Sequence, residues 1–289
     1  MSVNISRIAI FGGNGYLGSQ LAAYFAAKGV AYDVFDVPAF DVTRADCWET
    51  FSPTDYSAIL FFAGMTGTEK SFTDAERFLA VNEQGLLNLL MRLAPLGTHA
   101  PKIIFPSTRL VYKGSDEALS EDAPKEAKTV YAANKLACEY LLQAYHVRYG
   151  IPYAIVRICV PYGSLVSSDY SYGTIGFFLK QATAGGPITL YGDGSVRRTF
   201  THVGDICIAV ERLISSGAVG TYNIGGADYA LVDVARMIAE RKGVEVAFVP
   251  WPDVAARLES GSTFFNASKL SLAVGEIAYR DIRLLIEEL

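Results

Sequence analysis

The sequence has few of the features that mark nucleic-acid-binding, secreted or membrane proteins. Its net charge is −5 over 289 residues, and the absence of a basic tract argues against a nucleic-acid partner. No apolar run approaches the ~18 residues of a membrane span. The chain opens on a short apolar run and a glycine-rich turn, where a secreted protein would carry a signal peptide. We therefore expect a soluble, cytoplasmic protein that binds neither nucleic acid nor membrane.

Cysteine and charge are also scarce. The chain has four cysteines without a C-x-x-C pair, so we expect small core residues and no metal site. They are Cys47, Cys138, Cys159 and Cys207. Charged residues make up 19% of the chain and apolar residues 51%, the balance of a well-cored globular protein rather than a disordered one. The length allows one large domain or two modest ones.

The first forty residues carry the most specific local pattern. RIAIF (7–11) predicts a strand buried on both faces, and AYDVFD (31–36) predicts a second strand after a helix that ends at Gly29. The turn GGNGYLG places glycines at 12, 15 and 18, which suit a tight turn, close approach to a pyrophosphate and close helix–strand packing. Because an acid ends the second strand, this βαβ unit predicts dinucleotide binding at the helix N-terminus.

Asp36, the acid that ends this second strand, indicates which dinucleotide binds. Its carboxylate would accept hydrogen bonds from the adenosine ribose hydroxyls and would repel a 2′-phosphate. The next two residues, Val37 and Pro38, supply no cation that could hold such a phosphate. The sequence therefore favours NAD over NADP.

Alternating strands and helices continue through the first 160 residues. Strands are expected at 57–64 and 101–108, an amphipathic helix at 78–94, and a short strand end at Asp41–Val42 near the adenine. This alternation predicts an α/β fold with a parallel, doubly wound sheet, in which ligands bind beyond the carboxyl ends of the strands. Thr108, at the end of the strand 101–108, is thereby placed at the site.

Two Tyr-x-x-x-Lys pairs occur, a spacing that puts a phenol and an ammonium on one helix face. Tyr24 and Lys28 lie on the helix after the glycine turn, where we expect a packing tyrosine and a solvated helix-end charge. Tyr131 and Lys135 instead begin a helix that follows the strand ending at Thr108. Only this second pair is expected at the site.

The chain resembles the NAD-dependent epimerase/dehydratase family, extended short-chain dehydrogenases/reductases that act on nucleoside-diphosphate sugars. The resemblance rests on GGNGYLG, Asp36, the pair Asp41–Val42, FFAGMTG, VNEQG, STRLVY, YAANK followed by Glu139, RICVPYG, LYGDGSVRRTFTHVGD, TYNIGG and NASKL, in family order from residue 7 to about 270. It implies a Rossmann domain of residues 1–160 plus 202–225 and a smaller C-terminal substrate-binding lobe of 161–201 plus 226–289. It also implies a homodimer formed through the helix at 78–94 and the helix after Tyr131.

The resemblance further implies a catalytic set of Thr108, Tyr131 and Lys135. The Tyr131 phenol would take the proton of a sugar hydroxyl while hydride leaves the same carbon for NAD. Lys135 would lower the phenol pKa and hold the nicotinamide ribose, and Thr108 would orient the reacting oxygen. The implied cofactor-binding residues are Gly12, Asn14, Gly15, Tyr16, Leu17, Gly18, Asp36, Asp41, Val42, Phe62, Ala63, Gly64, Asn82, Tyr131, Lys135 and Pro161.

Five residues are implied on the substrate side. Arg198 would bind the pyrophosphate through its fork of N–H groups, with its neighbour Arg197 facing the surface. Thr189 and Tyr191 would line the nucleobase, and Arg257 would supply a second phosphate contact. Arg109 would either meet a carboxylated or phosphorylated sugar or point away from it.

Departures from the family pattern narrow the expected reaction. Arg109 and Leu110 stand where the 4,6-dehydratases carry Asp-Glu, and they cannot act as the acid and base that eliminate water. Val160 replaces an asparagine that usually contacts the phosphate side of the substrate, and the short chain is typical of 4-keto sugar reductases. We expect an NAD-dependent 4-epimerase that transfers hydride at the sugar C4. The alternative is a 4-keto-(deoxy)sugar-nucleotide reductase, a dehydratase is less favoured, and the intact catalytic set disfavours a cofactor sensor without catalysis.

Overall fold

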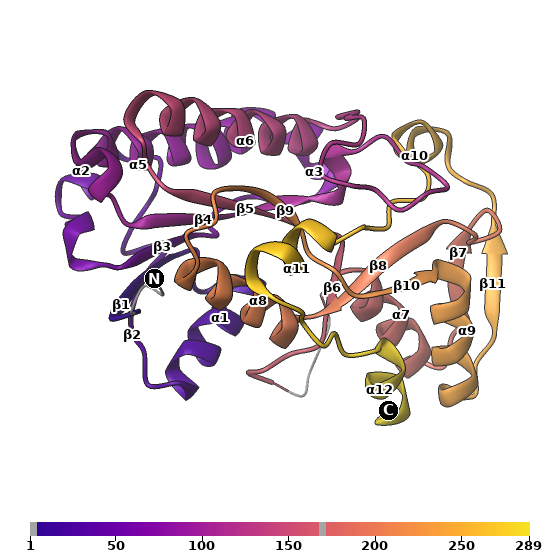
Figure 1. The fold of residues 1–289 in the computed structure, drawn as a ribbon. Helices are drawn as coiled ribbons and strands as arrows, with labels where there is room; N and C mark the ends of the chain where they lie inside the picture. Colours follow the sequence, from indigo (N-terminus) through magenta and orange to yellow (C-terminus); the bar gives the residue numbers. More distant parts are fainter. Residues whose placement is uncertain (1–4, 168–171) are drawn as a thin grey trace.

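A six-stranded parallel sheet forms the centre of the molecule (Figure 1). The computed structural model describes residues 5–167 and 172–289. The strands lie in the order β2-β1-β3-β4-β5-β9, so the chain winds outward from β1 in one direction and then from β3 in the other. They are β1 (Arg7–Phe11), β2 (Ala31–Phe35), β3 (Ala58–Phe61), β4 (Lys102–Thr108), β5 (Tyr153–Ile158) and β9 (Gly220–Asn223). The predicted doubly wound α/β (Rossmann) fold is confirmed.

Helices cover both faces of this sheet, which is why β3, β4 and β5 consist entirely of buried residues. One face packs against α1 (Tyr16–Ala27), α8 (Val203–Ser215) and α11 (Ser268–Val274). The other packs against α2 (Ala45–Glu49), α5 (Gly85–Leu93) and α6 (Val130–Tyr149), which lie above the sheet in Figure 1. Because both faces are covered, we expect ligands to bind at the carboxyl ends of the strands, as they do in other doubly wound sheets.

Two predicted elements differ in detail. Asp41–Val42 is not a strand, because the Asp41 carboxylate accepts hydrogen bonds from the backbone N–H and the hydroxyl of Thr43 and so closes a turn. The helix expected at 78–94 is divided into α4 (Ala75–Leu79), a π-helical segment (Ala80–Gln84) and α5, followed by a 3₁₀ segment (Ala94–His99). A π segment inside a helix often marks a functional site.

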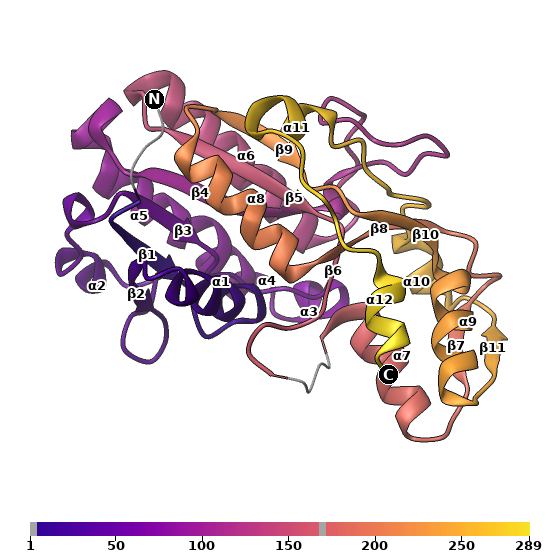
Figure 2. The ribbon, with the colours of Figure 1, turned by 60° about the horizontal axis from the view of Figure 1, so that its bottom comes forward.

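A second group of elements lies at the far end of the molecule from β1 and β2 (Figure 2). It contains a three-stranded sheet and a two-stranded sheet, with strand orders β10-β8-β6 and β11-β7. Their strands are β6 (Val160–Tyr162), β7 (Ile188–Tyr191), β8 (Arg197–His202), β10 (Ala227–Ala230) and β11 (Val246–Val249). The helices beside them are α7 (Gly173–Thr183), α9 (Leu231–Lys242), α10 (Asp253–Leu258) and α12 (Ile282–Glu287). The boundaries of the two predicted lobes stay a prediction. Residues 1–4 and 168–171, which fall within those predicted lobes, lie outside the described residues.

The remaining elements are short. They are α3 (Thr68–Thr73) and two 3₁₀ turns, η1 (Pro53–Asp55) and η4 (Arg109–Val111). Within residues 5–167 and 172–289, none of the helices has the length and apolar character that crossing a bilayer requires. Three of the four cysteines are buried and Cys47 is partly buried, so the thiols pack as the sequence predicted.

Candidate active site

Two adjoining cavities lie where the parallel strands end, on either side of the point at which the sheet reverses its winding. Each has a volume of about 570 Å³, and they share Gly12, Gly15, Phe62 and Gly64. We call them the catalytic cavity, which Thr108 and Tyr131 line, and the adenosine cavity, which Asp36 lines. Ligands of doubly wound sheets bind at such a reversal.

The glycine loop fits the back of a dinucleotide. Gly12 has a φ of +78°, and a Cβ there would lie 2.5 Å from the backbone nitrogen of Ala63. A Cβ on Gly18 would lie 2.1 Å from the carbonyl oxygen of Gly12, so helix α1 can pack against the loop only with glycine there. A Cβ on Gly15 would meet only that same oxygen, at 3.2 Å, because this residue faces the cavities. The three glycines thus serve the three purposes that the sequence predicted.

Asp36 is held in place at the mouth of the adenosine cavity. One carboxylate oxygen accepts a hydrogen bond of 2.9 Å from the backbone N–H of Asn14, and the other accepts one of 2.8 Å from that of Val37. The same cavity is lined by two cations that sequence reasoning missed, Lys70 of α3 and Arg77 of α4. The case for NAD therefore rests on the Asp36 carboxylate and not on a shortage of cations.

The other predicted cofactor residues line the cavities, with one exception. Tyr16, Leu17, Lys135 and Pro161 line the catalytic cavity, and Asn14, Asp41, Val42 and Ala63 line the adenosine cavity. Asn82 lies in the π-helical segment and is buried behind them. Its amide oxygen accepts a hydrogen bond of 2.7 Å from the Met65 N–H, and its amide nitrogen donates one of 3.1 Å to the Met65 carbonyl. Asn82 therefore shapes the loop after β3 and does not line the cavities.

The three predicted catalytic residues line one wall of the catalytic cavity. Thr108 ends β4, and its hydroxyl lies near enough to the Tyr131 phenol to lower the pKa of that phenol. Tyr131 is the second residue of α6, which begins where the Thr129 hydroxyl accepts a hydrogen bond from the Ala132 N–H. Lys135 lies one turn further on and donates a hydrogen bond of 2.8 Å to the Pro106 carbonyl. Strand β4 and helix α6 thus bring the set together.

The electrostatics of this wall differ in one respect from the expectation. Burial raises the pKa of the Tyr131 phenol well above its ordinary value, and Tyr172 acts in the same direction. The groups that lower the phenol pKa are the Thr108 hydroxyl and the Arg109 guanidinium, whereas Lys135 was expected to do so. Burial lowers the pKa of Lys135 to about 8.

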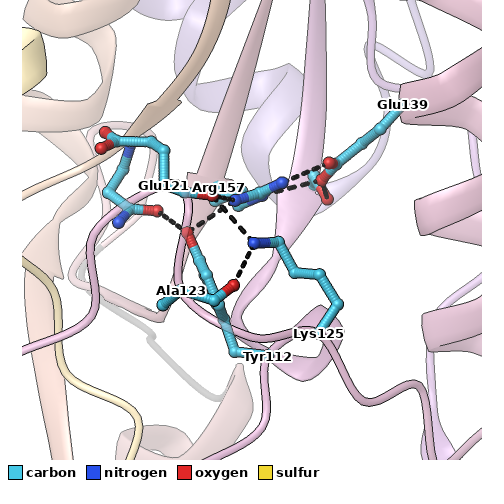
Figure 3. Close-up of polar contacts among 8 residues, drawn as sticks. Tyr112, Glu121, Ala123, Lys125, Glu139 and Arg157 are labelled. Atoms are coloured by element: carbon cyan, nitrogen blue, oxygen red, sulfur yellow. Dashed lines mark hydrogen bonds and ion pairs between the residues drawn. The ribbon is translucent and has the colours of Figure 1, made fainter.

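A buried polar network fixes α6 against the sheet (Figure 3). Glu139, one turn after Lys135, forms a two-pronged ion pair with Arg157 of β5, with N–O distances of 2.5 and 3.0 Å. The Ser107 hydroxyl, next to Thr108 on β4, donates a third hydrogen bond to Glu139. Figure 3 shows Arg157 between Glu139 on one side and Tyr112 and Glu121 on the other. The network ties together the two elements that carry Thr108 and Tyr131.

Of the predicted substrate residues, only Arg109 lines the catalytic cavity. Thr189 and Tyr191 lie on β7, and the Tyr191 ring is 5.1 Å from that of Trp251. Arg257 is exposed on α10. None of these three residues lines either cavity.

Arg198, the expected pyrophosphate ligand, is buried and already bonded. Its guanidinium donates to Glu259 at 2.8 Å and to the carbonyls of Arg197 and Gly261 at 2.9 and 2.7 Å. Arg197 is exposed, with its guanidinium 4.3 Å from the Phe264 ring centroid. The ion pair with Glu259 was not predictable from sequence, because the partners are 61 positions apart.

The second Tyr-x-x-x-Lys pair is separate from both cavities. The Tyr24 hydroxyl donates to the Glu211 carboxylate at 2.7 Å, and the Lys28 ammonium forms an ion pair with it at 2.6 Å. These contacts join α1 to α8. Lys28 is therefore exposed at the helix end, as the sequence predicted, and is also ion-paired, which the sequence did not predict.

Sequence reasoning also missed Tyr172, which directly precedes α7. Tyr172 lines the catalytic cavity, and its ring stacks on that of Tyr16 with the centroids 4.1 Å apart. No local signal points to it, because the contact joins positions far apart in the chain.

The comparisons with known proteins agree with this geometry. The sequence matches the model of the NAD dependent epimerase/dehydratase family over residues 8–225. It is 26% identical to a dTDP-L-rhamnose 4-epimerase of Burkholderia thailandensis, over 96% of this chain and 91% of the relative. It is 27% identical to a GDP-6-deoxy-D-mannose reductase of Pseudomonas aeruginosa, over 88% and 86%.

A solved structure shows the same fold. It is that of DesIV, a dTDP-glucose 4,6-dehydratase from Streptomyces venezuelae with NAD bound, at a TM-score of 0.84 and 23% identity, over 97% of this chain and 95% of that one. The family match covers most of the chain and includes the glycine loop, Asp36, Thr108, Tyr131 and Lys135. The protein therefore belongs to the NAD dependent epimerase/dehydratase family and is an NAD-dependent enzyme of the extended short-chain dehydrogenase/reductase type.

Proposed function

We propose that the protein modifies a nucleoside-diphosphate sugar, and that its reaction is the NAD-dependent 4-epimerisation of that sugar. One observation carries the proposal: Thr108, Tyr131 and Lys135 line a single cavity that is continuous with the glycine loop. The 4-epimerase of Burkholderia thailandensis, which matches almost the whole chain, supports the same class of substrate.

The residues of the catalytic cavity suit proton transfer at a sugar hydroxyl. The Tyr131 phenol would exchange a proton with the sugar hydroxyl, and the Thr108 hydroxyl, which lies beside the phenol, would orient the sugar oxygen. The Lys135 ammonium, which donates a hydrogen bond to the Pro106 carbonyl, would hold the nicotinamide ribose. When bound, NAD would supply the group that accepts hydride from the sugar and gives it back on the opposite face. Gly15 and the start of α1 would bind its pyrophosphate, and Asp36 its adenosine ribose.

A 4-keto-sugar-nucleotide reductase is the second candidate, and one observation favours it. Lys70 and Arg77 line the adenosine cavity with Asp36, and such cations could hold the 2′-phosphate of NADPH. The reductase of Pseudomonas aeruginosa is a relative over most of this chain. A dehydratase is disfavoured because Arg109 and Leu110 follow Thr108 where an acid and a base would be needed.

The first experiment identifies the nucleotide that the purified protein retains. Near-stoichiometric NAD, released on denaturation and weighed by mass spectrometry, supports an enzyme that regenerates its cofactor in each turnover. Incubation with sugar nucleotides, followed by NMR, should then interconvert two C4 epimers without net NADH formation. Stoichiometric consumption of NADPH with a 4-keto substrate would instead establish the reductase.

The two Tyr-x-x-x-Lys pairs provide a matched test of the catalytic assignment. Tyr131→Phe removes the proton-transferring hydroxyl and should lower kcat by about 10²- to 10⁴-fold while NAD is retained. Tyr24→Phe removes a hydroxyl of the same kind that donates to Glu211 outside both cavities. It should leave kcat unchanged, and equal loss in the two variants would refute the assignment.

We also propose that the protein is a homodimer assembled through α5 and α6. Tyr140 and Val147 of α6 are 59% and 86% exposed and lie seven positions apart, on one helix face. Met91 of α5 is 59% exposed as well. Large apolar side chains on neighbouring helices suit burial against a second copy of the same helices.

A further inference from the structure

Arg109 is a partly buried arginine of the catalytic cavity, and no carboxylate among the described residues pairs with its charge. It lines the catalytic cavity directly after Thr108, and among the described residues its guanidinium makes one hydrogen bond, which it donates to the Thr263 hydroxyl at 3.3 Å. Within residues 5–167 and 172–289, no carboxylate oxygen lies within 4.0 Å of its guanidinium. Its fork has five N–H groups, and the contact with Thr263 accounts for one of them, which leaves four for a ligand.

Two buried arginines near the site, unlike Arg109, each form an ion pair with a carboxylate. Arg157 is paired with Glu139 at 2.5 Å, and Arg198 with Glu259 at 2.8 Å. The groups that act on the Arg109 charge are the Arg198 guanidinium, which disfavours it, and Cys159, Glu259 and Tyr131, which favour it. This corner of the cavity therefore holds two cations and one carboxylate, and Arg198 already uses that carboxylate.

The uncompensated charge is costly for the protein on its own. Burial lowers the pKa of Arg109 to about 10, and the neighbouring Arg198 acts in the same direction. The guanidinium still remains protonated at neutral pH. An anion that entered the cavity would offset the cost of burying this charge.

The position of Arg109 indicates which part of a sugar nucleotide it would meet. The Arg109 guanidinium and the Thr108 hydroxyl both act on the Tyr131 phenol, so Arg109 lies near the group that handles the reacting C4 hydroxyl. The diphosphate is attached at C1, across the sugar ring from C4. Of the two ring positions next to C4, C3 carries a hydroxyl and C5 carries the exocyclic carbon, which in a uronic acid is a carboxylate.

We propose that Arg109 is a specificity-determining residue that binds a carboxylate on C5 of the sugar, so that the substrate is a uronic-acid nucleotide. A planar guanidinium can bind a carboxylate through two parallel hydrogen bonds, which an uncharged hydroxymethyl group in the same place cannot match. This inference rests on the proposed function, because it assumes that C4 of a sugar nucleotide lies at Tyr131.

The test uses three ligands that differ at one group each. Binding of UDP-glucuronate, UDP-glucose and UDP to the NAD-loaded protein is measured by calorimetry. The first two differ only in the carboxylate or hydroxymethyl group on C5, and UDP lacks the sugar. We expect UDP-glucuronate to bind about 10- to 100-fold more tightly than UDP-glucose, the difference that hydrogen bonds to a charged group typically make.

Two variants then ask whether Arg109 causes this preference. In Arg109→Gln the two sugar nucleotides should bind with nearly equal affinity, while UDP binding stays unchanged. Arg109→Lys keeps a charge without the fork and should retain part of the preference. Arg148→Gln removes an exposed arginine of α6 outside both cavities and should retain all of it. Retained NAD and a melting temperature no lower than that of the wild-type protein show that each variant is folded.

The remaining outcomes overturn the proposal in distinguishable ways. Equal loss for all three ligands in Arg109→Gln would assign the arginine to the diphosphate. Equal affinity of the wild-type protein for the two sugar nucleotides would refute the carboxylate, even if the variants failed to fold, and would leave the proposed function standing. A wild-type protein that bound none of the three ligands, and neither dTDP nor GDP, would refute the proposed function itself.

Discussion

Removing the Glu139 carboxylate should destabilise the protein far more than removing an equally close carboxylate on the surface. The side chains of Glu139 and Arg157 are 1% and 5% exposed, and their ion pair is 2.5 Å long. In Glu139→Ala the Arg157 guanidinium keeps its contacts with Tyr112 and the Glu121 carbonyl but loses its counter-charge. Breaking a buried pair from one side typically costs about 3–5 kcal/mol. That is at least about a fifth of the ~5–15 kcal/mol by which such domains are stable.

The chain contains a matched control for this prediction. Arg44 and Asp46 form an ion pair of the same length, 2.5 Å, but their side chains are 63% and 61% exposed. Because water screens this pair, Asp46→Ala should leave the free energy of unfolding unchanged within error. Urea denaturation followed by circular dichroism measures both variants under the same conditions.

A double variant separates the lost counter-charge from lost packing. Glu139→Leu/Arg157→Met replaces both charges with apolar side chains and should be more stable than Glu139→Ala, because no uncompensated charge stays buried. The Ser107 hydroxyl loses its acceptor in both proteins, so this cost cancels in the comparison. A Glu139→Ala variant as stable as Asp46→Ala would refute the reasoning, since it would show that the buried guanidinium needs no partner.

Three further predictions concern the loop, the pH dependence and the assembly. Gly18→Ala should abolish NAD retention and lower the melting temperature, because the added Cβ would lie 2.1 Å from a loop carbonyl oxygen. Gly217→Ala is the control and should do neither, because no atom lies within 4 Å of a Cβ added there. Between about pH 8 and 9 the free energy of unfolding should rise with pH, because burial lowers the pKa of Lys102, Lys125 and Lys135 to about 8 and the unfolded chain then binds more protons. Above pH 9 the buried thiols of Cys138 and Cys207, whose pKa burial raises to about 12, act in the opposite direction. Urea denaturation that showed a fall between pH 8 and 9 would contradict this prediction. Val147→Glu should convert a dimer into a monomer in light scattering, and an unchanged mass would exclude this helix from the interface.

Local sequence patterns were sufficient for the frame of the site. The βαβ unit with its glycine loop, the acid at the end of β2 and the hydroxyl at the end of β4 are all encoded within short segments. Burial alternates along strands and helices with fixed periods, and parallel strands end at the same edge of their sheet. For that reason Gly15, Asp36 and Thr108 were placed at one site before any contact was known.

The contacts of the charged side chains could not be read in this way. Arg198 looked like a diphosphate ligand, yet it is bonded to Glu259, 61 positions away. Lys70 and Arg77 gave no signal in the sequence, yet α3 and α4 bring them to the cavity that Asp36 lines. Whether an arginine is satisfied by its own protein or left for a ligand depends on which carboxylates the folded chain brings within a few ångströms, and periodicity carries no information about that.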